Sequence, residues 1–228
     1  SLLGSTTTFI VIKNATVLTM DAKKTVIENG VVAIKNNAIV EVGNGELLSK
    51  YKGKKTIDAE NDIVMPGFIN THTHVSMVAF RSSRYIFPLE NKLVSRDLVY
   101  KGAVYGILEM VSTGTTTFAD MYYFEDEVAK AAELIGVRGV LGETVIKNPV
   151  ADAKEPYGGI EYAEKFIKQY KNSELVTPAF APHAPYTVDE EHLKKVTELS
   201  QKYNIPVLMH VAETENEVKQ IKEKYNMT

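Results

Sequence analysis

The sequence of 228 residues contains no cysteine. This absence excludes disulfides, thiol nucleophiles, zinc ribbons and the deaminase fold in which cysteines hold the zinc ion. A chain without thiols is also compatible with a reducing compartment, and we expect a cytoplasmic protein.

Strong net charge and long apolar runs are missing as well. The formal net charge is −3, which is too weak to favour a nucleic acid or an anionic membrane surface as a partner. No apolar run approaches the ~20 residues that span a bilayer, and we expect no signal peptide. With 44% hydrophobic and 24% charged residues, the composition is typical of a globular protein. We therefore expect no nucleic-acid or membrane partner.

Residues 9 to about 60 are rich in β-branched and apolar residues, which are separated by residues that form turns. These features predict a small β-domain over residues 1–61, with no visible chemistry of its own. We expect short strands at Phe9–Lys13, Val17–Met20, Val26–Ile34, Ala38–Val42 and Thr56–Asp58.

From residue 62 onward, strand patterns alternate with helical patterns. This alternation predicts an α/β domain over residues 62–228, with a parallel sheet and helices outside it. Five strands fit a doubly wound sheet or the first five units of an eight-stranded barrel, which typically needs ~250 residues. We expect the strands at Ile63–His74, Thr115–Tyr122, Arg138–Val145, Leu175–His183 and Pro206–Val211.

The helices between these strands have recognisable starts and ends. Ser95 can cap one helix, and Gly136 can end another. Two further helices follow patterns in which a threonine precedes a glutamate by three residues, which is typical of a capping box. We expect helices over Asp97–Val111, Glu125–Ile135 and 160–171, and after Thr187-x-x-Glu190 and Thr214-x-x-Glu217.

His72 and His74 stand at the carboxyl end of the first of these strands. In a strand, residues two apart point to the same face, so two neutral imidazoles can bind one metal ion there. The carboxyl ends of strands are also where α/β barrels place their chemistry. The alternative is a pair of surface histidines at a strand end, since a bare His-x-His is a common pattern.

His210 lies near the end of the last expected strand, and Glu213 follows three residues later. Glu213 must lie past the strand end, where the turn can bring it back toward His210. A carboxylate beside a metal-bound water can carry a proton to the substrate. In the alternative interpretation, His210 packs in the core and Glu213 favours the start of the next helix through its dipole.

His183 ends the fourth expected strand, between Pro182 and Pro185. Prolines restrict the backbone on either side, which suits a histidine that must be aimed at a ligand. The alternative is a loop histidine that is satisfied by solvent. His192 lies among charged residues of an expected helix, and we interpret it as a surface residue.

Five segments make the sequence recognisable. They are, in order, Pro-Gly-Phe-Ile-Asn-Thr-His-Thr-His, Ile-Phe-Pro-Leu-Glu, Thr-Gly-Thr-Thr-Thr-Phe-Ala-Asp-Met-Tyr, Ala-Pro-His-Ala-Pro-Tyr and His-Val-Ala-Glu-Thr. Together they resemble the amidohydrolase superfamily, most closely its S-adenosylhomocysteine/5-methylthioadenosine deaminase branch, from about residue 9 to the end. The resemblance implies an α/β fold, namely the N-terminal part of a (β/α)8 TIM-type barrel (about five of eight units) with a small β-sandwich domain. It also implies a small-molecule substrate, one divalent metal and hydrolytic deamination of an adenine nucleoside or related amino-heterocycle.

The resemblance also assigns roles to particular residues. It implies that His72, His74 and His210 are metal ligands, with zinc expected and iron, manganese or nickel as alternatives. Glu213 is similar to the catalytic acid that carries a proton to the substrate ring. Glu90 is similar to the residue that accepts hydrogen bonds from ribose hydroxyls. His183 is similar to a catalytic histidine that contacts the reacting end of the substrate.

The sequence departs from the family pattern in three places. A further histidine and an aspartate of the family site would lie beyond Thr228. Five of eight strands would also leave two unpaired edges, which pair readily with other chains. We therefore expect a homo-oligomer, a C-terminal half that is supplied in trans, or residues beyond this sequence to replace the missing strands. The substrate-covering segment between Arg81 and Ile86 is shorter than in the family. Glu143 stands where members that act on the carboxylate-bearing thioether have an arginine, which puts recognition of that carboxylate in doubt.

Other functions within and outside the superfamily remain open. Two-metal cyclic amidases bridge their metals with a modified lysine on the fourth strand, and the segment Leu175–His183 contains no lysine. This absence favours one metal and a deaminase. Guanine deaminase, cytosine deaminase and triazine chlorohydrolase share the one-metal site and remain alternatives. The alternative that is not an enzyme is an inactive half-barrel.

Overall fold

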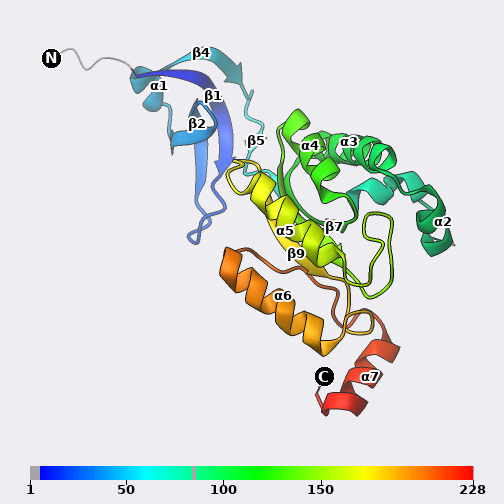
Figure 1. The fold of residues 1–228 in the computed structure, drawn as a ribbon. Coiled ribbons are helices and arrows are strands. Elements are labelled where there is room, and N and C mark those ends of the chain that lie inside the picture. The colour runs from blue at the N-terminus through cyan, green and yellow to red at the C-terminus, as the bar shows by residue number, and fades with distance from the viewer. Residues whose placement is uncertain (1–5, 84–85, 228) are drawn as a thin grey trace. The chain divides into compact units, whose positions relative to one another are not determined.

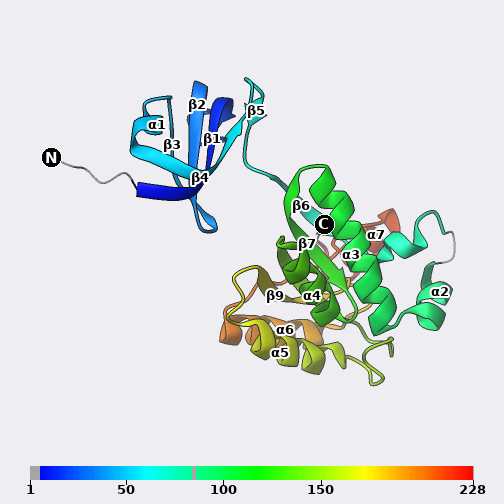
Figure 2. The same cartoon turned by 90° about the horizontal axis from the view of Figure 1, so that it is seen from above.

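The computed structural model describes residues 6–83 and 86–227 (Figures 1 and 2). The chain divides into two compact units, Ser1–Gly67 and Phe68–Thr228. Arg84 and Tyr85, which belong to the short segment discussed above, lie outside the described residues. None of the described helices is both long enough and apolar enough to cross a membrane.

The first unit is a five-stranded sheet with one short helix. Its strand order is β3-β2-β1-β4, and β5 also pairs with β1. Residues 6–18 form a single strand where the sequence predicted two, Phe9–Lys13 and Val17–Met20. The chain does not turn at Asn14, which adopts a left-handed conformation (φ 53°) at a shift in register. The elements are β1 (Thr6–Leu18), β2 (Val26–Lys35), β3 (Ala38–Gly43), α1 (Leu47–Lys50), β4 (Tyr51–Asp58) and β5 (Ile63–Val64).

The predicted single strand Ile63–His74 is wrong. Its first two residues form β5 and pair with β1 in the first unit, whereas Phe68–Thr73 form β6 in the second unit. Pro66, between them, has no N–H to donate to a ladder, and Gly67 follows it. The strand that carries His72 therefore begins after this kink.

The second unit contains a parallel sheet whose strand order, β6-β7-β8-β9, follows the sequence. In a doubly wound sheet the order reverses at a switch point, and the described strands show no such reversal. All carboxyl ends lie at the same edge because the pairings are parallel. The strands are β6 (Phe68–Thr73), β7 (Thr115–Tyr122), β8 (Arg138–Val145) and β9 (Val176–Pro182).

Helices α3, α4 and α5 pack against one face of this sheet (Figure 2). Phe118 of β7 and Leu141 of β8 are fully buried among them, while α6 joins a second cluster with Phe180 of β9. The other face of the sheet is left for the site described below. The helices are η1 (Val75–Phe80), α2 (Ile86–Leu93), α3 (Arg96–Ser112), α4 (Glu125–Ile135), α5 (Gly159–Tyr170), α6 (Glu190–Tyr203) and α7 (Glu215–Tyr225).

Most of the predicted helix ends are confirmed. The side chain of Ser95 accepts a hydrogen bond from Leu98 N in the first turn of α3. Gly136 ends α4 in a left-handed conformation (φ 86°). The predicted capping box at Thr187 is wrong, because Asp189 caps α6. The hydroxyl of Thr187 instead donates to Ala184 O and contacts the ring of His183.

The fifth predicted strand, Pro206–Val211, is not a regular strand. It makes one β-bridge, between Phe180 and Val207, and the hydrogen bond from His210 N to His183 O lies outside that register. Pro182 and Pro206 lack the N–H groups that a continuous ladder needs. The segment still runs alongside β9, which places His210 at the edge where the other strands end.

Two buried carboxyls, Glu143 and Asp152, hold the start of α4. Glu143 Oε2 accepts from Glu125 N (3.1 Å), and Asp152 Oδ2 accepts from Phe124 N (2.6 Å). Their other oxygens are buried and have no hydrogen-bond partner among the described residues. Burial, and secondly the charge of Asp152, raise the pKa of Glu143 well above its ordinary value. A proton on Glu143 that is donated to Asp152 satisfies both remaining oxygens.

The pairing of Glu143 with Asp152 predicts that the free energy of unfolding falls as the pH rises. The unfolded state ionises Glu143 near pH 4.5, whereas the folded state keeps it protonated to a higher pH. Between the two pKa values the free energy of unfolding falls by about 1.4 kcal/mol per pH unit. Gln is an isostere of the protonated acid, so we expect Glu143→Gln to melt higher than the wild type at pH 8 but not at pH 5.

Thermal unfolding at pH 5, 6.5 and 8 measures this difference. Glu198→Gln, at an exposed position of α6, is the control and should follow the wild type at every pH. A Glu143→Gln variant that melts lower than the wild type by the same margin at all three pH values would contradict the shared proton.

Candidate metal centre

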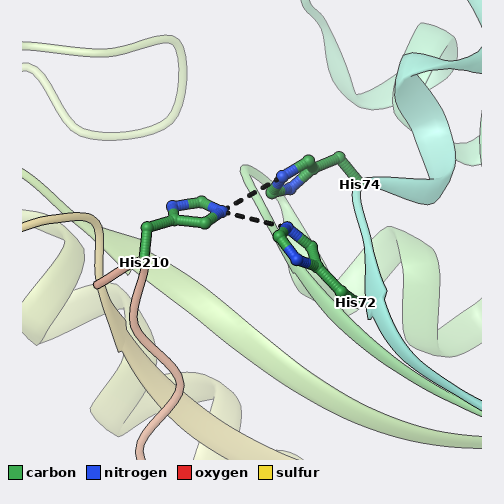
Figure 3. A group of neighbouring side chains, drawn as sticks. All are labelled: His72, His74 and His210. Atoms are coloured by element: carbon green, nitrogen blue, oxygen red, sulfur yellow. Dashed lines mark hydrogen bonds between the residues drawn. The ribbon is translucent and has the colours of Figure 1, made fainter. Parts of the chain in front are cut away.

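Three histidine rings meet at the carboxyl edge of the parallel sheet (Figure 3). His72 lies near the end of β6, His74 directly precedes η1, and His210 comes from the segment beside β9. His210 Nε2 lies 3.2 Å from His72 Nε2 and 3.3 Å from His74 Nε2. Within residues 6–83 and 86–227, no other group of three potential ligands comes this close together.

Backbone carbonyls fix the tautomers of two of these rings. His74 Nδ1 lies 2.7 Å from Met121 O, and His210 Nδ1 lies 3.1 Å from His183 O. Since a carbonyl can only accept, each Nδ1 carries the hydrogen, and each Nε2 presents a lone pair when the ring is neutral. Two lone pairs 3.3 Å apart repel each other unless a cation lies between them.

The spacing of the three nitrogens fits a tetrahedral metal ion. With metal–nitrogen bonds of about 2.0–2.1 Å, two ligands of a tetrahedral zinc site lie roughly 3.3–3.4 Å apart. The measured separations from His210 are 3.2 and 3.3 Å. Burial, and secondly His74, lower the pKa of His210, which favours the neutral form that a metal requires. The donor set therefore fits a divalent cation.

Asp120 holds the backbone from which His74 projects. Its Oδ1 accepts from the hydroxyl of Thr73 (2.5 Å) and from Val75 N (2.7 Å), the two residues that flank His74. Asp120 is buried on the neighbouring strand β7, with an exposed fraction of 1%. This arrangement orients the histidine by holding its neighbours, as metal sites commonly require.

His183 lies next to the three histidines, and a hydrogen bond to Thr187 defines its tautomer. Thr187 donates its hydroxyl hydrogen to Ala184 O, so its oxygen accepts from His183 Nδ1 at 2.9 Å. The opposite nitrogen, Nε2, is then an acceptor in the neutral ring. Burial, and secondly His210, lower the pKa of His183. The ring lies 5.2 Å from that of His210, edge to face.

Glu213 lies beyond the segment end, as the sequence predicted, and lines the same cavity as the histidines. Ala212 adopts a left-handed conformation (φ 57°), which turns the chain before Glu213. The hydroxyl of Tyr186 donates to Glu213 Oε2 at 3.3 Å. Glu213 is exposed, so its carboxylate is accessible to a bound molecule.

Glu90 and Tyr122 form a buried pair in the same cavity. The hydroxyl of Tyr122 donates to Glu90 Oε1 at 2.8 Å. Tyr122 is 3% exposed, and Glu90 is 7% exposed. Burial raises the pKa of Glu90, and the hydrogen bond from Tyr122 opposes this shift. The sequence analysis missed Tyr122, although it ends one of the five recognised segments.

The cavity that these residues share has a volume of about 260 Å3. A larger cavity of about 450 Å3 lies beside α7, but none of the five histidines lines it, so we place the site by its donor groups. Thr144 faces the shared cavity, whereas Glu143, its neighbour on β8, lies beneath it among the buried carboxyls. The lining residues are His72, His74, Met77, Ile86, Glu90, Met121, Tyr122, Tyr123, Thr144, His183, His210 and Glu213.

His192 lies away from this cavity. Its Nδ1 is 2.7 Å from Asp189 Oδ1, and its ring stacks on Tyr157 with centroids 3.5 Å apart. These contacts connect the start of α6 to the loop between β8 and α5, which contains Tyr157, and they give His192 a structural role.

Relatives of known name resemble this chain over most of its length. A 5-methylthioadenosine/S-adenosylhomocysteine deaminase of Thermodesulfovibrio yellowstonii is 41% identical over 227 residues, which covers 93% of this chain and 52% of that protein. A 5'-deoxyadenosine deaminase of Methanocaldococcus jannaschii is 38% identical, over 86% of this chain and 49% of that protein. The chain thus spans about half the length of the curated relatives it matches.

A solved structure has the same fold. The adenosine deaminase of Xanthomonas campestris, crystallised with bound zinc, superposes with a TM-score of 0.92 at 28% identity. The superposition covers 97% of this chain and 53% of that one. The family model described as the amidohydrolase family matches residues 63–228. With this match and these relatives, the chain belongs to the amidohydrolase family.

Proposed function

We propose that the whole protein catalyses metal-dependent hydrolytic deamination of an adenine nucleoside. The observation that carries this proposal is the meeting of three imidazole donors with Glu213 and Glu90 around one cavity. The deaminase names of relatives at 41% and 38% identity support the adenine nucleoside class. Substrates of this class are adenosine, 5-methylthioadenosine and S-adenosylhomocysteine.

The cavity supplies the groups that such a reaction needs at the reacting end. When bound, a divalent cation, for which we propose zinc, supplies the Lewis acidity that makes water nucleophilic near neutral pH. We assign to Glu213, which lines the cavity, the transfer of a proton from the water side to the ring nitrogen beside the amino-bearing carbon. With that nitrogen protonated, the water oxygen adds to the carbon. Its remaining proton then passes to the amino group, and the C–N bond breaks, which releases ammonia and leaves a carbonyl on the ring. His183 offers its Nε2 to a hydrogen-bond donor at the same end.

The part of the cavity lined by Glu90 and Tyr122 suits a sugar. Tyr122 occupies only one oxygen of Glu90, so the other oxygen can accept from a ribose hydroxyl. A buried carboxylate that accepts from hydroxyls discriminates strongly against analogues that lack them, because its oxygen would then be unpaired. We therefore propose Glu90 as the residue that binds the ribose.

We infer that the second unit is the N-terminal part of a TIM-type barrel, about five of eight units, over residues 62–228. The consecutive parallel order of its strands and the position of the histidines at their carboxyl ends support this inference. We also infer that residues 1–61 form part of a small β-sandwich, since their sheet has its own hydrophobic clusters.

The first prediction from this proposal concerns Glu213. In the full-length protein, Glu213→Gln should lower kcat by ~10²–10⁴, because Gln keeps the size but cannot carry the proton. Metal content should remain that of the wild type. Ammonia release from adenosine and 5-methylthioadenosine, with metal analysis of each preparation, measures both quantities. A fully active Glu213→Gln protein would remove Glu213 from the reaction.

The histidines should respond differently. His72→Ala or His210→Ala removes one of three ligands, so we expect the loss of bound metal and, with it, of activity. His192→Ala is the matched control, since His192 lies away from the centre and should leave metal content unchanged. Metal retained at the wild-type level in both ligand variants would contradict the metal centre.

The third prediction concerns the substrate. Among the described residues, no lysine or arginine lines the cavity, whereas Glu90 and Glu213 do. A substrate carboxylate would therefore meet like charge without a partner. We expect kcat/KM for S-adenosylhomocysteine to be no higher than for 5-methylthioadenosine, which has the thioether without the carboxylate. A strong preference for the carboxylate-bearing substrate would contradict this expectation.

A further inference from the structure

Glu217 is a buried glutamate at the start of α7, with an exposed fraction of 3%. In a capping box, such a glutamate reaches back to the N–H of the cap residue, here Thr214. The hydroxyl of Thr214 does accept from Glu217 N at 3.2 Å, so the helix start has its cap. The carboxylate of Glu217 reaches further back, and accepts from Ala212 N at 2.9 Å and from Glu213 N at 3.0 Å.

These two hydrogen bonds fix the backbone that carries Glu213. Ala212 has a φ of 57°, a left-handed conformation that is unfavourable for a residue with a Cβ atom. Successive N–H groups around such a residue form a concave site for an anion. Each oxygen of Glu217 fills one half of this site, so the carboxylate holds both peptide groups that flank Ala212.

The side chain of Glu213 depends on this backbone because little else holds it. Among the described residues, the hydroxyl of Tyr186 is its only side-chain hydrogen-bond partner, at 3.3 Å. Both Glu213 and Tyr186 are exposed. A catalytic group that is displaced by about 1 Å can lose ~10²-fold in rate.

We propose that Glu217 is a positioning residue, whose carboxylate holds the turn at Ala212 and so aims Glu213 at the substrate. It acts on the rate without touching the metal or the substrate. This inference rests on the proposed function of Glu213 as the proton carrier.

The test is Glu217→Gln in the full-length protein. Gln offers one acceptor oxygen, and its NH2 group faces the second N–H, so the two peptide groups can no longer both be held. We expect kcat to fall by roughly 10- to 100-fold, with KM and metal content close to those of the wild type. A wild-type kcat would overturn the proposal.

Two control variants separate positioning from a general effect on the helix. Glu215→Gln removes the same charge from the same first turn, at an exposed position. Thr214→Ala removes the helix cap and leaves the carboxylate of Glu217 in place. Both should keep kcat, and Thr214→Ala should lower the melting temperature. If Thr214→Ala loses as much kcat as Glu217→Gln, the helix start is responsible and the proposal is overturned.

Two further variants keep the test decisive. If Glu217→Gln does not fold, Glu217→Asp keeps the charge but withdraws the carboxylate; an intermediate kcat at full metal content supports the proposal, and a wild-type kcat overturns it. Glu213→Gln is assayed in parallel. If it is inactive while both Glu217 variants are fully active, only the positioning role fails. If Glu213→Gln is itself active, the proposed function of Glu213 fails first.

Discussion

The candidate site exists only because the parallel sheet is strongly curled. His72 and His74 belong to the first strand of the second unit, and His210 belongs to the segment beside the fourth. In a flat sheet, the first and fifth positions are four spacings of about 4.8 Å apart, or roughly 19 Å, which two imidazole side chains cannot span. The measured separations of 3.2 and 3.3 Å require the carboxyl ends to bend toward each other. The curvature is thus a condition of the chemistry.

The same constraint links metal binding to the fold. The segment that carries His210 is tied to β9 and the turn after it by a few backbone hydrogen bonds, interrupted at two prolines. A cation shared by His72 and His210 would join the two lateral limits of the described sheet. Because the three histidines are brought together only in the folded chain, part of the free energy of metal binding would then stabilise the curled sheet. The carbonyl contacts of His74 and His210 keep both Nε2 atoms aimed at the shared point.

Local sequence patterns account for the regular elements but not for the contacts that join them. The expected bounds of β7, β8 and α4 agree with the structure, since each is an apolar pattern with clear turn residues at its ends. The convergence of three histidines also follows from their places at strand ends, although their role as ligands stays a prediction. Backbone chemistry at prolines explains two errors, the split at Pro66 and the irregular segment after Pro206.

The remaining contacts join residues that are far apart in the chain, so no local sequence pattern predicts them. Met121 O fixes the tautomer of His74 from 47 positions away, and Tyr122 binds Glu90 from 32 positions away. Thr187 has the spacing of a helix cap but is used by His183, because Asp189 is available to cap α6. Glu217 likewise matches a capping pattern, yet its carboxylate serves the turn before the helix. In both cases a residue has two compatible partners, and tertiary packing decides between them.

The alternation of side chains along the strands separates two populations of carboxyl groups. On the helix side, burial raises the pKa of Glu143 well above its ordinary value, which favours the neutral form, and the side chain accepts a hydrogen bond from α4. On the cavity side, Glu90 and Glu213 each have one oxygen that accepts no hydrogen bond from the described residues. Adjacent positions on β8 show the rule, since Glu143 supports α4 while Thr144 lines the cavity. The carboxylates that line the cavity itself are therefore the two for which we propose binding and proton transfer.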